Sequence, residues 1–273
     1  MKDDPSVSVA MGIRYRRESL EPLHRSVESI LNQTVADFEL LICDDGSTLE
    51  ASRVLDEYAA RDGRIRLLRP GGALELPQKL NVCLRQARGG YIARMDDDDW
   101  SHPERFARQL AALEQEREIA FAGCSVNLCR DGARVGARDL PVYPSVRDFY
   151  DTSPFVHPAL VFRRSALEAV GGYCEEPYCR LCEDYDLLMR LYAAGYRGKN
   201  LPDRLLDYTL PPKGKKNRAL RDRLHEAQTR WRRYHELGVL HEAWIYTAKP
   251  IAAALLPQRA VERLREIRDQ HTK

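Results

Sequence analysis

Short apolar runs alternate with longer amphipathic stretches along the first 100 residues. Each run is typical of a buried strand, and the stretches between them carry apolar residues at the three- and four-residue spacing of a helix. Alternation with short connections predicts a parallel sheet with right-handed crossovers. The expected strands are 7–13, 38–43, 64–68 and 91–95, and the expected helices cover 22–31, 47–58 and 79–87.

The pattern after residue 100 is less regular. Ser101, Pro103 and Glu104 form a capping-box pattern with a proline in the first turn, which predicts a helix beginning there. Asp131-Gly132 is typical of a hairpin turn. Mixed strand directions are therefore expected in this half. The expected elements are a helix at 103–116, strands at 119–129, 134–140 and 155–162, and a helix at 187–194.

The most acidic stretch, Asp96-Asp97-Asp98-Asp99, directly follows the expected strand at 91–95. Ligands of open α/β sheets bind at the carboxyl ends of the strands. Clustered carboxylates suit Mg²⁺ or Mn²⁺, which one or two acids hold together with substrate phosphates. A solvated acidic loop is the alternative. An EF-hand does not fit, because Ser101 stands where its loop requires glycine.

A second acidic group, Asp44-Asp45, ends the expected strand at 38–43. Parallel topology would bring both groups to one edge, where a nucleoside diphosphate could bridge them. Turn and helix-cap chemistry is the alternative for this group. Gly12, in the first strand, is a place where the backbone could approach a ligand closely. The sequence contains no Walker lysine motif and no G-x-G-x-x-G motif, so it indicates neither a P-loop nor a dinucleotide fold.

Glu183 and Asp184 open the helix expected at 187–194. One of them is a candidate general base, since transfer onto a hydroxyl needs a carboxylate near that proton. The alternative is that they only stabilise the helix N-terminus, which favours carboxylates. His157, in an apolar run, is first interpreted as a core histidine and second as a contact to an acceptor.

Three cysteines lie close together upstream of Glu183. Their C-x₄-C-x₂-C spacing resembles an iron–sulfur pattern, but no downstream cysteine completes it. Cys124 or Cys129 would have to supply a fourth ligand, so ordinary thiols in an acceptor loop are preferred. The three residues are Cys174, Cys179 and Cys182.

Composition places the chain among globular proteins. Its 273 residues are 44% hydrophobic and 31% charged, and a net charge of +2 gives no reason to expect a nucleic-acid partner. The N-terminus lacks the apolar core of a signal peptide, and the apolar run at 251–256 is too short to span a bilayer. Seven cysteines in such a chain are interpreted as reduced thiols of a cytoplasmic protein.

The tail from residue 213 onward differs from the rest of the chain. Its first part is basic, aromatic residues follow, and a charged helix is expected at 260–270. Basic residues followed by aromatic and apolar ones suit an interfacial helix on the anionic inner face of a membrane. A solvated helix that packs on the domain through its aromatic residues is the alternative.

Five stretches of the sequence form a pattern when taken together: 6–11, 29–34, 38–47, 91–99 with 103–105, and Glu183-Asp184. In this order they resemble glycosyltransferase family 2, over about residues 6 to 210. That resemblance implies a GT-A fold: a Rossmann-like, mostly parallel central sheet with helices on both faces, here with a C-terminal helical extension. It also implies a nucleotide-sugar donor, a divalent metal and inversion at the anomeric carbon. The expected division is a GT-A domain at 1–212, with nucleotide-binding and acceptor halves at 1–100 and 101–212, and a tail at 213–273.

The resemblance also implies roles for individual residues. Asp44 would contact the base, Asp98 would be the main metal ligand with Asp96 beside it, and Asp184 would be the catalytic base. The remaining nucleotide contacts would be Met11, Gly12, Lys79, Asp96 and Asp97, and the acceptor contacts Glu183, Trp100 and His157.

The resulting hypothesis is a transferase that moves one sugar, with UDP preferred and dTDP second. The processive Q-x-x-R-W motif is absent, because Gln228 and Trp231 are one residue too close. A glycan or lipid-linked saccharide of surface polysaccharide synthesis is the expected acceptor. One alternative is a sugar-phosphate nucleotidyltransferase, although no second glycine follows Gly12 in the loop that such an enzyme would use. The other alternative is a non-catalytic nucleotide-binding module associated with a membrane.

Overall fold

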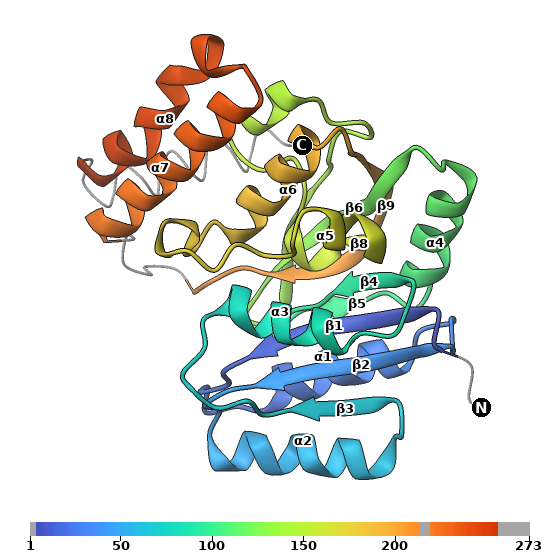
Figure 1. Ribbon diagram of the computed structural model, residues 1–273. Coiled ribbons are helices and arrows are strands. Elements are labelled where there is room, and N and C mark those ends of the chain that lie inside the picture. The colour runs from blue at the N-terminus through green and yellow to red at the C-terminus, as the bar shows by residue number, and fades with distance from the viewer. Residues whose placement is uncertain (1–3, 213–218, 256–273) are drawn as a thin grey trace.

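A nine-stranded sheet forms the centre of the computed structural model, which describes residues 4–212 and 219–255 (Figure 1). The strand order is β3-β2-β1-β4-β8-β6-β9-β5, and β7 pairs with β6 outside this path. The strands are β1 Val7–Ile13, β2 Phe38–Asp44, β3 Ile65–Leu68, β4 Tyr91–Arg94, β5 Trp100–Ser101, β6 Ile119–Arg130, β7 Ala133–Arg138, β8 Val161–Arg163 and β9 Arg197–Thr209.

The first four strands of this order are parallel, as the alternating pattern predicts. Their residues are mostly buried because helices cover both faces of the sheet, and this explains their continuous apolar character. One core cluster contains residues of α1 Glu21–Leu31, α2 Leu49–Arg61 and α4 Arg105–Gln115. The other contains residues of α3 Leu76–Gln86, α5 Arg164–Ala169 and α6 Glu183–Ala193.

The second half is mixed, as expected. β8 runs antiparallel to β4 and β6, whereas β9 runs parallel to β6 and pairs with it over ten positions. The hairpin between β6 and β7 turns at Asp131 and Gly132, whose φ values of 51° and 77° are left-handed. Three short 3₁₀ helices complete this half: η1 Val146–Phe149, η2 His157–Ala159 and η3 Pro177–Cys179.

The helix expected at 103–116 is present as α4, but its expected start is wrong, and so is one expected strand. Ser101 does not cap a helix; it lies in β5, and its hydroxyl accepts hydrogen bonds from Gln33 at 3.0 Å and Arg105 at 2.8 Å. α4 begins only at Arg105 and has no side-chain cap. The strand expected at 155–162 is divided into η2 and β8, since Pro158 has no N–H for a ladder.

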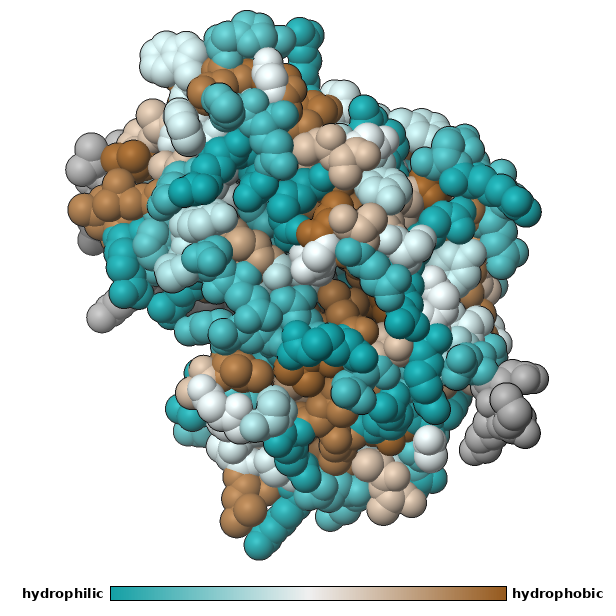
Figure 2. Space-filling view, in the orientation of Figure 1, coloured by the Kyte–Doolittle hydropathy of each residue, from teal (hydrophilic) through white to brown (hydrophobic). Residues whose placement is uncertain are grey.

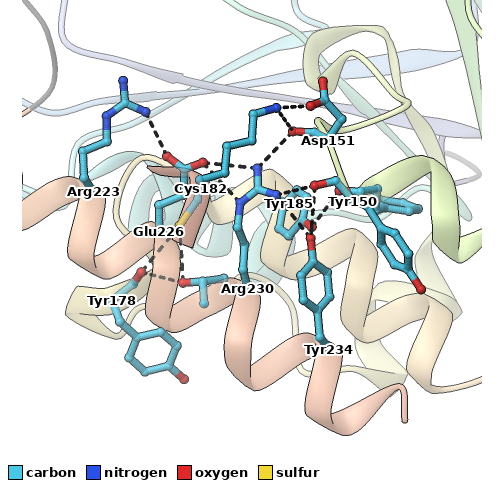
Figure 3. A network of polar contacts seen from close by, with 12 residues as sticks. Tyr150, Asp151, Tyr178, Cys182, Tyr185, Arg223, Glu226, Arg230 and Tyr234 are labelled. Carbon is cyan, nitrogen blue, oxygen red and sulfur yellow. Dashed lines mark hydrogen bonds and ion pairs between the residues drawn. The ribbon is translucent and has the colours of Figure 1, made fainter. Parts of the chain in front are cut away.

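The C-terminal part forms a helical hairpin of α7 Leu220–Glu236 and α8 Leu240–Leu255. Figure 3 shows how α7 docks on the domain: the Arg230 guanidinium donates to the Tyr150 carbonyl at 2.8 Å, and the Tyr234 and Tyr185 hydroxyls lie 2.8 Å apart. The helix expected at 260–270 lies outside the described residues. Nowhere in the described ranges is a helix both long and apolar enough to cross a membrane.

Candidate functional site

Both acidic groups lie at the same edge of the sheet. Asp44 is the last residue of β2 and pairs with Ile13 at the end of β1, while Asp96 follows β4 on the other side of β1. The loop after β1 contacts both groups, because Arg14 pairs with Asp45 at 3.6 Å and Arg17 pairs with Asp98. The meeting of the two groups at one carboxyl edge is therefore confirmed.

The cluster from Asp96 to Asp99 carries more negative charge than its surroundings neutralise. Arg94, which is fully buried, pairs with Asp96 at 2.5 Å, and the Thr209 N–H donates to Asp99 at 2.7 Å. Burial, then Asp98 and Asp96, raises the pKa of Asp97 to about 7. The second carboxylate oxygen of Asp99 is buried without a hydrogen-bond partner. Hard oxygen donors with excess negative charge fit Mg²⁺ or Mn²⁺.

At the end of β2 the carboxylates are tied to turn backbone and to hydroxyls. The Asp44 carboxylate accepts from the Ser52 hydroxyl at 2.9 Å and from the Ser47 N–H at 3.4 Å. The ammonium of Lys79 is buried beneath this corner and donates to the Ile13 carbonyl at 2.7 Å. Burial, and after it Arg14, lowers the pKa of Lys79. The bonds from Ser47 and Ser52 are the turn chemistry that was the alternative for Asp44, whereas the N-cap of α2 is Thr48.

Met11 and Gly12 lie in the wall behind this corner. Met11 is fully buried in the core, so its side chain does not reach the edge. A Cβ atom at Gly12 would lie 2.9 Å from the Lys79 Cβ and 3.1 Å from Leu76, so the close approach at this glycine is made by α3.

Glu183 and Asp184 occupy the first turn of α6 and are both partly buried. Burial is the main cause that raises the pKa values of the Tyr173 and Tyr208 hydroxyls, and Asp184 and Asp96 both contribute to each rise. Asp184 and Asp96 therefore both contribute to the electrostatic surroundings of these two tyrosines.

The two other residues predicted to contact the acceptor, His157 and Trp100, differ in their surroundings. His157 is buried, and its Nε2 atom lies 2.8 Å from the Tyr173 hydroxyl. Burial, and after it Arg94, lowers its pKa well below the usual value, so the interpretation as a core histidine is confirmed. Trp100 is half-buried in β5, with its ring edge-on to that of His102 at 4.5 Å between centroids.

Sequence reasoning named Lys79 but missed the two arginines that pair with the acidic cluster, Arg17 and Arg94. Arg94 lies in an otherwise apolar strand just before the acids, and this single charge in an apolar run could have predicted that Arg94 pairs with one of them. Arg17 lies in a loop whose path the sequence did not define. No sequence pattern indicated Tyr173 or Tyr208, because Tyr173 lies in the loop before α6 and Tyr208 lies in β9, a strand that was not expected.

In the part of the chain that the structure describes, a candidate metal group contains two of the three neighbouring cysteines together with one aspartate. Cys174, Cys179 and Asp186 place their ligand atoms within 4.8 Å of one another, but the Cys182 thiol lies instead against Thr229 at 3.4 Å. The Asp186 carboxylate is already paired with Arg190 at 2.7 Å and Arg233 at 2.9 Å. Thiols are soft ligands, so this group does not suit Mg²⁺ or Mn²⁺.

Similarity to known proteins indicates the class of protein to which this site belongs. The family model "Glycosyl transferase family 2" matches residues 13–171. "Putative glycosyltransferase EpsE" of Bacillus subtilis is 34% identical over 274 residues, which cover 100% of this chain and 98% of the relative. An Escherichia coli protein named "UDP-Gal:alpha-D-GlcNAc-diphosphoundecaprenol beta-1,3-galactosyltransferase" is 30% identical over 80% of each chain.

Among solved structures, a mannosyltransferase from Pyrobaculum calidifontis in complex with GDP-Man and Mn²⁺ superposes with a TM-score of 0.63. It is 18% identical, and the match covers 97% of this chain and 80% of the other. The chain belongs to glycosyltransferase family 2. The predicted family, the GT-A α/β fold and the glycosyltransferase class are thereby confirmed.

Proposed function

We propose that the chain moves a single sugar from a nucleoside-diphosphate donor to an acceptor hydroxyl, with inversion and with a divalent metal. The observation that carries the proposal is that Asp44, at the end of β2, and the acids that follow β4 lie at one carboxyl edge of the sheet. Asp98 is our candidate among those acids, and Asp184, in the first turn of α6, is our candidate for a third carboxylate. A diphosphate between the first two carboxylates would present its sugar toward the third. Holding donor and acceptor across one cleft supplies much of the acceleration, because it replaces a chance encounter by a fixed orientation.

A UDP-sugar is our preferred donor. Asp44 has acceptor capacity left beside its bonds to Ser47 and Ser52, and can take the N–H of uracil or, second, of thymine. The ribose and phosphates would lie along Asp96 and Asp97. The named donor of the E. coli relative supports this choice. Asp98, with Asp96, would hold Mg²⁺ or Mn²⁺, which when bound neutralises charge on the departing diphosphate.

Asp184 acts as the general base. The acceptor oxygen forms a bond to the anomeric carbon on the face opposite the diphosphate, the bond to the diphosphate breaks, and the hydroxyl proton passes to the Asp184 carboxylate. Glu183 and Trp100 face the acceptor, and His157 acts on that side only through Tyr173. We favour a glycan or lipid-linked saccharide of surface polysaccharide synthesis, since the E. coli relative is named for a diphosphoundecaprenol-linked acceptor.

A screen of nucleotide sugars tests this function. We expect a UDP-sugar to be hydrolysed slowly by the protein in the presence of Mn²⁺, with release of UDP, and far less after chelation of the metal. Chromatography of the released nucleotide measures the reaction. Release of pyrophosphate from a nucleoside triphosphate would instead indicate a nucleotidyltransferase. Metal-dependent binding of UDP without hydrolysis or transfer would indicate a non-catalytic module.

We further propose that the α7–α8 hairpin binds an anionic membrane surface. Leu220, Leu224 and Trp231 are exposed along one face of α7, next to the exposed cations Arg221 and Arg232. On α8 the large apolar residues Trp244 and Ile245 are 62% and 59% exposed. Apolar side chains are visible on the outer part of this hairpin, at the upper left of Figure 2. Aromatic and apolar groups beside arginines fit anionic headgroups above acyl chains.

Replacing both Trp244 and Ile245 by Ser should weaken binding to phosphatidylglycerol vesicles about tenfold, because it removes apolar area that would enter the bilayer. Co-sedimentation measures the bound fraction. Leu49→Ser is the matched control, since Leu49 is 69% exposed at the start of α2, far from the hairpin in the chain. Equal binding of both variants would refute the lipid surface. If the unmodified protein is a dimer and the double variant a monomer, the exposed face of α8 binds a second copy of the chain instead of lipid.

A further inference from the structure

The loop after β1 carries three arginines that the proposed function does not use. The Arg14 Nε atom donates to the Asp45 carbonyl at 3.1 Å, the Arg16 Nε atom donates to the Gly46 carbonyl at 3.1 Å, and Arg17 pairs with the Asp98 carboxylate. This loop therefore crosses the end of β1 and reaches both acidic groups. Of the three arginines, Arg17 is the one that pairs with the carboxylate assigned to the metal.

The backbone of this loop is anchored at Tyr15. The Tyr15 side chain is buried, its hydroxyl donates to the Ser19 carbonyl at 2.7 Å, and its N–H donates to the Ser47 hydroxyl at 2.8 Å. The Arg17 side chain, in contrast, is 49% exposed. A fixed backbone with a solvent-exposed guanidinium leaves the side chain room to turn without moving the loop.

The two arginines that pair with the acidic cluster differ in exposure. Arg94 pairs with Asp96 and is buried, as is its neighbour Met95. Arg17 pairs with Asp98, and its side chain is 49% exposed. Arg17 therefore occupies the carboxylate that the proposed function assigns to the metal, and of the two arginines it is the one with room to leave.

We infer that Arg17 holds Asp98 as a substitute cation in the donor-free protein and turns to the donor's diphosphate when donor and metal bind. The inference rests on the proposed function and deepens it, because it names a residue that couples the two ligands. The guanidinium fork suits two phosphate oxygens as well as it suits a carboxylate. Once Arg17 has turned, Asp98 is available to a divalent cation and the diphosphate gains a positive charge.

Replacing Arg17 by Ala should strengthen the binding of Mn²⁺ and weaken the binding of pyrophosphate. Mn²⁺ alone should bind about three- to fivefold more tightly, since a half-exposed ion pair no longer competes for Asp98. Pyrophosphate at saturating Mn²⁺ should bind at least about tenfold more weakly, since a charged hydrogen-bond donor is lost. The paramagnetic resonance signal of free Mn²⁺ measures the first affinity and calorimetry the second. Pyrophosphate is used because it lacks both base and sugar.

Arg16→Ala is the matched control, because Arg16 lies in the same loop and contacts only the Gly46 carbonyl among the described residues. It should leave both affinities unchanged, and Arg17→Lys should fall between Arg17→Ala and the unmodified protein. Unchanged or weaker Mn²⁺ binding by Arg17→Ala, or unchanged pyrophosphate binding, would overturn the inference alone. An unmodified protein that binds neither Mn²⁺ nor a nucleoside diphosphate would overturn the proposed function with it.

Discussion

Asp184→Asn is expected to lower sugar transfer by about 10²- to 10⁴-fold while leaving donor binding unchanged. Asparagine has nearly the shape of aspartate but cannot take the acceptor proton. Two contacts fix the first turn of α6 and should keep the variant folded: the Cys182 thiol lies 3.4 Å from the Thr229 hydroxyl, and the Tyr185 and Tyr234 hydroxyls lie 2.8 Å apart (Figure 3). The loss should therefore fall on the chemical step.

Transfer is measured with the donor found in the screen, and donor affinity is measured by calorimetry. Glu183→Gln, one residue earlier on the same turn, is the control and should act mainly on the KM for the acceptor. If Asp184→Asn still transfers sugar at the normal rate, the base is a different residue.

The contacts of α7 indicate a second role for the C-terminal hairpin, beside the proposed lipid surface: α7 packs against the turn of α6 that carries the proposed base. Thr229 and Tyr234 of α7 touch Cys182 and Tyr185, the residues on either side of Glu183 and Asp184. The sequence patterns separated the tail from the domain and offered no reason to connect it with the base. That connection depends on contacts 47 and 49 residues apart in the chain, which local patterns do not encode.

The parallel half of the sheet could be predicted because burial on both faces makes its strands continuous apolar runs. β9 could not: Arg197–Thr209 is a long strand with the polar sequence RGKNLPDRLLDYT. It forms because β6 offers it a partner, with register shifts near Cys124 and Ser125. At the site, the acidic groups were visible as sequence, whereas the placement of Arg17 on Asp98 depends on the path of a loop.

Asp98→Ala should abolish metal-dependent nucleotide binding. Asp98 is the carboxylate of the cluster that pairs with Arg17. Burial, and after it Asp96, raises the pKa of Asp98, so the charged form of this carboxylate is disfavoured in the free protein. Removing it should leave the melting temperature without ligand unchanged or higher, because one of several repelling charges is gone. A loss of nucleotide binding could then not be explained by unfolding.

Thermal melting with Mn²⁺ and UDP separates a loss of ligand binding from a loss of stability. A ligand that binds only the folded state at about 100 times its Kd adds about 2.7 kcal/mol of stability, which should raise the melting temperature of the unmodified protein by several degrees. Asp98→Ala should show no rise. Glu57→Ala, which removes an exposed carboxylate from α2, should rise as the unmodified protein does. An equal rise in Asp98→Ala would place the metal on other ligands, and Asp98 would then serve only as the partner of Arg17.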